Sequence, residues 1–218
     1  MQFIASHDHF RGPASIRTSV TVPLAFPDGY ETVAQVFTFR GLADGKEHLL
    51  LALGDWQHTA MPLVRLHSEC LTGDVFGSQR CDCGPQLREA VEEIARDGGF
   101  LLYLRQEGRG IGLYEKLDAY ALQDQGLDTY QANEALGHPA DARDYTAAAQ
   151  MLEAVGHTTV ALLSNNPDKA AQLEGLGITV ADRQPTGVFA RDANRRYLET
   201  KVLSTGHTID LPMPLLAA

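Results

Sequence analysis

The sequence contains no apolar run long enough to cross a membrane. The longest apolar stretch near the middle of the chain covers residues 48–53, whereas a transmembrane helix needs about 20 apolar residues. The first residues also lack the basic region and apolar core of a secretory signal. We therefore expect a cytoplasmic protein that has no membrane partner.

Basic residues are scarce. The chain has 18 Lys and Arg against 28 Asp and Glu, which gives a net charge of -10. Proteins that bind duplex nucleic acid meet its phosphates with Lys and Arg, so we expect no nucleic-acid partner. A single small nucleotide is compatible with this charge, because a triphosphate needs only a few local cations and backbone amides.

Cysteine is also rare, and its distribution is uneven. The only three cysteines are Cys70, Cys81 and Cys83, and an odd number in a chain without a leader argues against a disulfide framework. Their neighbours are polar, which predicts metal ligands. Three thiolates would leave one of zinc's four positions for water, whose pKa zinc lowers to about 7. A structural site closed by a histidine such as His67, and unliganded thiols, remain open as alternatives.

The composition is that of a globular protein, with 44% hydrophobic and 21% charged residues. We expect an irregular arm over residues 1–16, one catalytic domain over 17–206, and a loose tail over 207–218. The domain is expected to be rich in β-structure to about residue 70. Alternating patterns and turn residues there predict strands over 32–39, 48–53 and 62–67, in a mostly antiparallel region.

After Cys83, helical patterns alternate with buried strands. Apolar spacing predicts helices that start at Pro85 and near Leu113, Asp144, Pro167 and Asn194. The predicted strands cover residues 100–104, 159–163 and 178–180. This alternation predicts an α/β fold, with a mostly parallel sheet flanked by helices and an N-terminal, mostly antiparallel β region.

Two strand-to-helix junctions are candidate phosphate sites, because ligands bind at the carboxyl ends of parallel strands. Residues 105–112 hold three glycines together with Glu107 and Arg109, and arginine binds phosphate oxygens in bidentate fashion. Residues 164–169 combine Ser164, a helix start and Lys169. Taken singly, each junction can equally be ordinary turn or cap chemistry.

Three further groups of polar residues lie near these segments. Residues 65–69 place a cation, an imidazole, a hydroxyl and a carboxylate just before Cys70. Asp141 and Arg143 are two residues apart and can point into one cleft if they lie in a loop. Tyr120 lies on a predicted helix, and its residue type alone favours a buried aromatic with a satisfied hydroxyl.

Together these fragments, in this order, resemble the GTP cyclohydrolase II family, whose enzymes start riboflavin synthesis. The resemblance covers roughly residues 30–206. The stretches that carry it are residues 65–74, 80–84, 105–113, 120–126, 141–145, 164–167 and 197–201.

The resemblance implies a reaction and a set of site residues. GTP and water would give formate, diphosphate and 2,5-diamino-6-ribosylamino-4(3H)-pyrimidinone 5′-phosphate in a homodimer, with one Zn²⁺ per chain on the three cysteines and Mg²⁺ on the triphosphate. Asp141 would accept a proton, Arg143 would attack the α-phosphate, and Tyr120 would serve water attack and deformylation. The implied GTP contacts are Arg65, Leu66, His67, Ser68, Glu69, Gln86, Glu107, Gly108, Arg109, Thr129, Ser164 and Lys169.

Some residues depart from the family pattern. Ser164 stands where threonine is usual, His138 replaces an aromatic residue, and residues 184–191 differ from the usual Val-Pro-Leu stretch. These departures favour a divergent paralogue.

Three alternative functions remain. A homologue could stop at the formamidopyrimidine, although the presence of Tyr120 argues against it. A zinc deaminase, prompted by His67-x-Glu69, would need a Pro-Cys-x-x-Cys signature that the chain lacks. A nucleotide-binding protein without catalysis would have a fourth protein ligand on its zinc.

Overall fold

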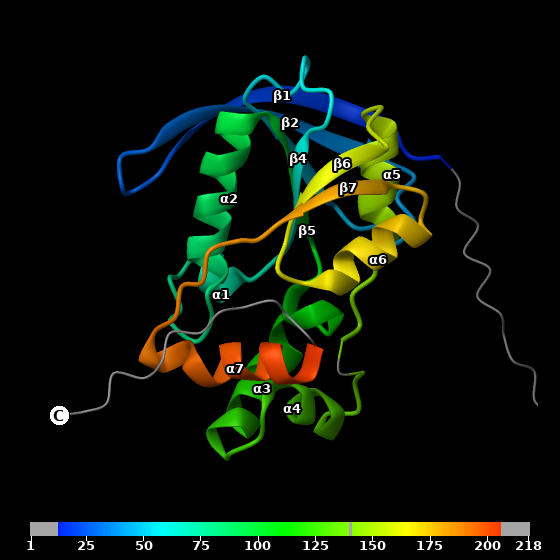
Figure 1. Ribbon diagram of the computed structural model, residues 1–218. Coiled ribbons are helices and arrows are strands. Elements are labelled where there is room, and N and C mark those ends of the chain that lie inside the picture. The colour runs from blue at the N-terminus through cyan, green and yellow to red at the C-terminus, as the bar shows by residue number, and fades with distance from the viewer. Residues whose placement is uncertain (1–12, 140, 206–218) are drawn as a thin grey trace, which may run out of the picture.

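A single seven-stranded sheet organises the molecule (Figure 1). The computed structural model describes residues 13–139 and 141–205, so most of the expected arm and all of the expected tail lie outside the described residues. The strands are β1 Ser15–Ala25, β2 Glu31–Arg40, β3 Leu49–Leu53, β4 Leu63–Ser68, β5 Gly99–Leu104, β6 Thr159–Leu163 and β7 Thr179–Gln184.

From residue 71 onward, one or more helices separate each strand from the next. The α-helices are α1 Leu71–Asp74, α2 Cys83–Asp97, α3 Leu113–Asp124, α4 Thr129–Ala135, α5 Thr146–Ala154, α6 Pro167–Gly175 and α7 Arg195–Thr205, and the 3₁₀ helices are η1 Glu107–Gly110 and η2 Asp192–Asn194. None of the helices in the described ranges combines the length and apolarity that crossing a bilayer requires.

The sheet has two halves that differ in strand direction. Its order is β1-β2-β3-β5-β4-β6-β7. Strands β1, β2, β3 and β5 pair antiparallel, whereas β5, β4, β6 and β7 pair parallel. The predicted α/β fold is confirmed, but the antiparallel region ends earlier than expected, because β4 pairs with two parallel strands.

Strand β1 was not predicted, and its first two residues fall in the stretch expected to be irregular. It pairs with β2 along its whole length, from Ser15 opposite Arg40 to Ala25 opposite Glu31. The strand lies at the sheet edge, and most of its residues are exposed. An edge strand with two solvated faces has no strong alternation of apolar and polar residues, which is the signal that predicts strands.

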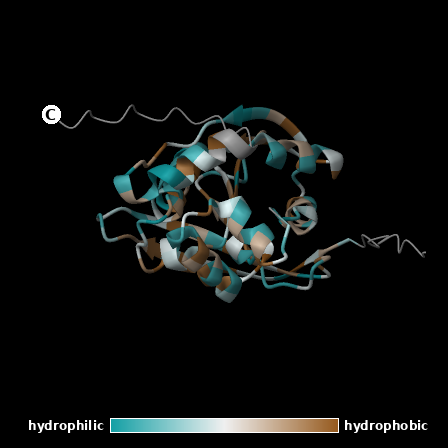
Figure 2. Cartoon of the chain, turned by 90° about the horizontal axis from the view of Figure 1, so that it is seen from below, coloured by the Kyte–Doolittle hydropathy of each residue, from teal (hydrophilic) through white to brown (hydrophobic). Residues whose placement is uncertain are grey.

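Helices cover both faces of the sheet, and each face has its own apolar core. On one face α5 and α6 contribute Ala148, Met151, Leu152 and Leu173. On the other, α2 contributes Ala90, Val91 and Ile94. In Figure 2 the helices carry both teal and brown bands, as expected of helices that bury one face and expose the other. Two short helices, α1 and α4, were not predicted.

The four parallel strands end at the same edge of the sheet, and α3, α4 and α7 gather below that edge (Figure 1). At this edge β4 and β6 separate, because their register includes only Leu63 opposite Ala161 and Val64 opposite Leu162. Two side chains then bond to the strand carbonyls. Arg65 Nη1 donates to Leu163 O at 3.1 Å, and Lys169 Nζ donates to Leu66 O at 2.7 Å. The sheet therefore opens where a ligand is expected to bind.

Gly99, at the start of β5, should tolerate no side chain. An added Cβ would lie 2.0 Å from Leu63 O and 2.6 Å from Leu63 N, both backbone atoms of the neighbouring strand. We expect Gly99→Ala to lower the free energy of unfolding by about 3 kcal/mol, measured by urea denaturation. Gly175→Ala is the matched control, since nothing lies within 4 Å of its added Cβ. An equal loss in both variants would contradict this explanation.

Candidate active site

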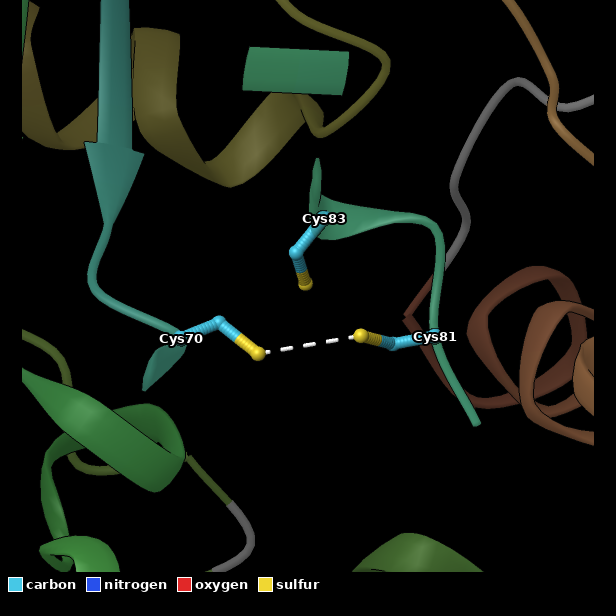
Figure 3. Close-up of side chains that lie close together, drawn as sticks. All are labelled: Cys70, Cys81 and Cys83. Carbon is cyan, nitrogen blue, oxygen red and sulfur yellow. Dashed lines mark hydrogen bonds between the residues drawn. The ribbon is translucent and has the colours of Figure 1, made fainter. Parts of the chain in front are cut away.

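The three cysteines converge below the end of β4 (Figure 3). Cys70 follows β4, whereas Cys81 and Cys83 lie at the start of α2, and their sulfur atoms all lie within 4.8 Å of one another. The Sγ atoms of Cys70 and Cys81 are 3.7 Å apart. Gly73 makes this possible, because a Cβ there would lie 2.8 Å from Cys81 Sγ and 3.0 Å from Cys70 Sγ.

This cluster suits a zinc ion with an open position. Three thiol ligands converge on one point, and zinc prefers such donors. Within the described ranges no fourth His, Cys, Asp or Glu joins the group. His67 does not close it, because its Nε2 lies 3.1 Å from Asp74 Oδ1. Hydrogen bonds from Cys81 and Cys83 lower the pKa of the Cys70 thiol, and the Lys116 ammonium adds to that shift.

Asp74 holds the residues around the cluster, and sequence analysis gave it no role. Its buried carboxylate accepts hydrogen bonds from Cys70 N at 3.0 Å and Tyr103 Oη at 2.8 Å, in addition to the one from His67. The His67 bond places the ring proton on Nε2 and leaves the Nδ1 lone pair on the other side. Burial lowers the pKa of His67 and outweighs the opposite effect of Asp74, so the ring is neutral at pH 7.

A cavity extends from the cysteines across the carboxyl edge of the sheet. Its walls come from strand ends, from residues 105–112 (the glycine-rich segment) and from helices α2, α3, α4 and α6. Of the residues predicted as substrate contacts or catalytic groups, those that line it are Arg65, His67, Ser68, Glu69, Gln86, Gly108, Arg109, Tyr120, Thr129, Arg143, Ser164 and Lys169. The structure thus brings together segments that are distant in the sequence.

Three predicted residues lie beside the cavity without lining it. The Leu66 side chain is 1% exposed and packs in the core, and its carbonyl accepts the hydrogen bond from Lys169. Glu107 is buried and pairs with Lys116 at 2.7 Å. The Asp141 carboxylate pairs with Arg143, whose Nε donates a hydrogen bond to Asp141 Oδ1 at 2.8 Å. These residues support their neighbours.

The glycine-rich segment aims Arg109 at the cavity through an unusual backbone. Gly108 and Arg109 both have left-handed conformations, with φ of 61° and 62°, and such strain in a non-glycine residue is typical of functional sites. The guanidinium lies over the Tyr130 ring at 4.2 Å. Ala142 N donates to Arg109 O at 3.1 Å, which ties this segment to the loop that carries Asp141 and Arg143.

The catalytic candidates Tyr120, Asp141 and Arg143 have distinct environments. Burial raises the pKa of Tyr120, so its hydroxyl stays protonated at neutral pH, and the Arg80 guanidinium lies 4.5 Å from its ring centroid. Burial opposes ionisation of Asp141, but hydrogen bonds from Arg143 outweigh it and lower the pKa of that carboxyl. Asp141 is therefore a carboxylate at neutral pH, and its partner is Arg143.

Buried polar atoms without a partner concentrate here. Among the described residues there are four such side-chain atoms: Arg65 Nε, His67 Nδ1, Arg109 Nη1 and Tyr145 Oη. The first three belong to residues that line the cavity. Because an unpaired buried polar atom costs about 1–3 kcal/mol, their grouping favours a polar ligand in this cavity.

Comparison with known proteins identifies the family of the chain. The model of the GTP cyclohydrolase II family matches residues 19–185. The chain belongs to the GTP cyclohydrolase II family. GTP cyclohydrolase-2 of Psychromonas ingrahamii is 52% identical over 180 residues, which is 82% of this chain and 90% of that protein. The chain is thus a GTP cyclohydrolase II-type hydrolase, as the motifs predicted.

Two further relatives differ in how much of their length this chain covers. GTP cyclohydrolase-2 of Vibrio parahaemolyticus is 50% identical over 177 residues, covering 81% of this chain and 89% of that protein. Riboflavin biosynthesis protein RibBA of Bacillus subtilis is 51% identical over 190 residues, covering 86% of this chain but only 48% of that longer protein. The chain therefore spans about half the length of this second kind of relative.

Lys116 lines the cavity, and sequence analysis missed it. Its Nζ lies 3.1 Å from Cys70 Sγ and 2.7 Å from Glu107 Oε1. Burial opposes its charge, but Glu107 and Cys70 outweigh that effect and raise the pKa of Lys116. The available signal was its spacing, because Lys116 lies one helical turn before Tyr120 and shares its face of α3.

Proposed function

We propose that this protein hydrolyses GTP at two places, in a reaction that depends on zinc. Water opens the imidazole ring at C8, a second water releases formate, and a third completes the hydrolysis at the α-phosphate, which releases diphosphate. The product is 2,5-diamino-6-ribosylamino-4(3H)-pyrimidinone 5′-phosphate, an intermediate of riboflavin biosynthesis. Magnesium accompanies the triphosphate. The proposal agrees with the names of the relatives, two of which are called GTP cyclohydrolase-2.

The observation that carries the proposal is the open cysteine cluster at the end of a polar cavity. Three sulfur atoms gather within 4.8 Å, and no further protein ligand joins them within the described ranges. A structural zinc site has four protein ligands, whereas a catalytic one keeps a position open. The zinc would be held by Cys70, Cys81 and Cys83, and it would supply Lewis-acid activation of water at neutral pH.

The residues near the cysteines would handle the base. The protonated hydroxyl of Tyr120 is able to donate to the oxygen that develops at C8, or to the leaving nitrogen. His67 is neutral, and its Nδ1 lone pair is able to accept a proton of the guanine or of water. Both groups line the same cavity as the cysteines.

The cationic residues of the cavity would handle the triphosphate. Arg109, Arg143 and Lys169 line the cavity and provide cations for the charge that develops when the α–β bond breaks. Arg143 would attack the α-phosphate and displace diphosphate, with Asp141 as the acceptor of its proton. Water would then hydrolyse the bond between Arg143 and phosphorus to free the 5′-phosphate. The hydrogen bond from Arg143 Nε to Asp141 Oδ1, 2.8 Å long, supports that pairing.

Product analysis tests the proposal directly. Zinc-loaded protein is incubated with GTP and magnesium, and the products are identified by mass spectrometry, with a separate assay for formate. We expect formate, diphosphate and the diaminopyrimidine phosphate. Accumulation of the formamidopyrimidine without formate would favour a homologue that stops after ring opening. Recovery of unchanged GTP despite tight binding would favour a nucleotide-binding protein with a structural zinc.

We also propose a cytoplasmic homodimer. The edge strand β1 has no second neighbour among the described residues. Ile16 and Val20 on β1 and Val33 on β2 are 42%, 48% and 56% exposed, and exposed apolar residues on a sheet edge are typical of surfaces that pair with another chain. Light scattering coupled to size-exclusion chromatography should give twice the chain mass of 23.7 kDa.

A further inference from the structure

Lys116 makes contacts that ordinary helix lysines do not make. It comes from the first turn of α3, and only 10% of its side chain is exposed. Its ammonium group donates to Cys70 Sγ at 3.1 Å, Thr72 Oγ1 at 3.1 Å and Glu107 Oε1 at 2.7 Å. These three acceptors match the three protons of an ammonium group, so the orientation of Lys116 is fixed.

Those contacts place a fixed positive charge against one of the sulfur ligands. Three thiolates and a zinc ion carry a net charge of -1, and the negative charge would reduce the ion's power to activate water. A hydrogen bond from an ammonium group withdraws electron density from the sulfur it contacts, and groups around metal ligands tune both affinity and Lewis acidity in this way.

We propose that Lys116 is a positioning residue that tunes the cysteine site by donating to Cys70. The inference rests on the proposed zinc site and adds a residue to it. Lys116 also lies near the ring of Tyr120, with Nζ 5.6 Å from the ring centroid. It therefore connects the metal ligand Cys70, the glycine-rich segment through Glu107, and the helix that carries Tyr120.

The competing explanation is purely structural. Glu107 is buried, and a buried carboxylate needs a partner. Lys116 would then be present only to neutralise Glu107, and its proximity to Cys70 would have no effect on the metal. The two explanations differ in what happens when both charges are removed together.

The experiment compares Lys116→Met, Lys116→Arg and the double variant Glu107→Gln/Lys116→Met. Zinc affinity is measured by competition with a chromophoric chelator, and the sulfur-to-metal charge-transfer band is recorded with Co²⁺. We expect Lys116→Met to lose about 10–100-fold in zinc affinity, because the buried site of net charge -1 loses the cation that compensates it. The band should shift to lower energy, because a sulfur without a hydrogen-bond donor is the better electron donor. Lys116→Arg, which keeps the charge, should recover most of the affinity.

The double variant decides between the explanations. Under our proposal, it keeps the weakened affinity and the shifted band, because Cys70 still lacks its donor. Native affinity and a native band in the double variant, or in Lys116→Met, would overturn the proposal. If Lys116→Met alone does not fold, the neutral double variant still gives the answer. Lys46→Met, an exposed lysine outside the site, is the control for loss of one positive charge. Failure of the native chain to bind zinc would instead contradict the proposed function.

Discussion

Cys81→Ser is expected to abolish the release of formate from GTP. A serine hydroxyl does not ionise near neutral pH as a thiol does, so the ion would lose one of its three ligands. Without activated water at neutral pH, we expect the rate to fall by roughly 10³-fold or more. Formate is assayed after incubation with GTP and magnesium, and metal content is measured in parallel by mass spectrometry.

A control is needed because Cys81 is 6% exposed and packs inside the site. Gln79→Ser introduces the same residue type two positions earlier, at an exposed position of the same loop. It should release formate at the native rate, and circular dichroism should be unchanged in both variants. If Cys81→Ser kept its zinc and its formate release, the cysteine cluster would not be the metal site of the reaction.

Arg143→Ala should reduce diphosphate release by about 10³-fold, the lower end of the effects known for arginines at a phosphoryl centre. The guanidinium is held at the cavity by Asp141 and is 14% exposed. Its removal takes away both the proposed nucleophile and a cation that faces the triphosphate. Diphosphate is measured with a coupled pyrophosphatase assay, and zinc content should remain that of the native protein.

Two further variants sharpen that result. Arg143→Lys keeps a charge but loses the two-pronged contact with Asp141, so most of the loss should persist. Arg183→Ala removes an exposed arginine of β7 and should behave as the native chain does. Native rates of diphosphate release in Arg143→Ala would remove Arg143 from the reaction.

Much of the site could be predicted because its residues lie in short segments with chemical meaning. Cys81 and Cys83 are one residue apart, so their sulfurs share a neighbourhood in almost any fold, and polar neighbours made a buried apolar role for them improbable. The carboxyl ends of β4, β5 and β6 were predictable from the alternation of helices and strands. Parallel pairing then brings residues 68–70, 105–109 and 164–166 to one edge.

Other features depend on contacts that a single sequence does not encode. Lys116 resembles any solvated helix lysine until its partners Cys70 and Glu107 are known to lie beside it. Asp74 occurs within a motif that was recognised, yet one of its three hydrogen bonds comes from Tyr103, which lies in β5 beside β4. The buried position of the Leu66 side chain was predictable, because Leu66 alternates with Arg65 and His67 and points to the opposite face of β4.

The separation of β4 from β6 has a consequence for how this enzyme is able to change. Arg65 and Lys169 donate hydrogen bonds to strand carbonyls that would pair with a neighbouring strand in a continuous sheet. Each residue therefore both lines the cavity and satisfies the backbone where the two strands separate. A substitution at either position must weaken folding and substrate capture together. The wall formed by α3 and α4 is not part of the sheet, although Lys116 of α3 contacts Cys70 and Glu107. New substrate preferences in this lineage should therefore arise from the other residues of the helical wall, while the sheet wall stays constant.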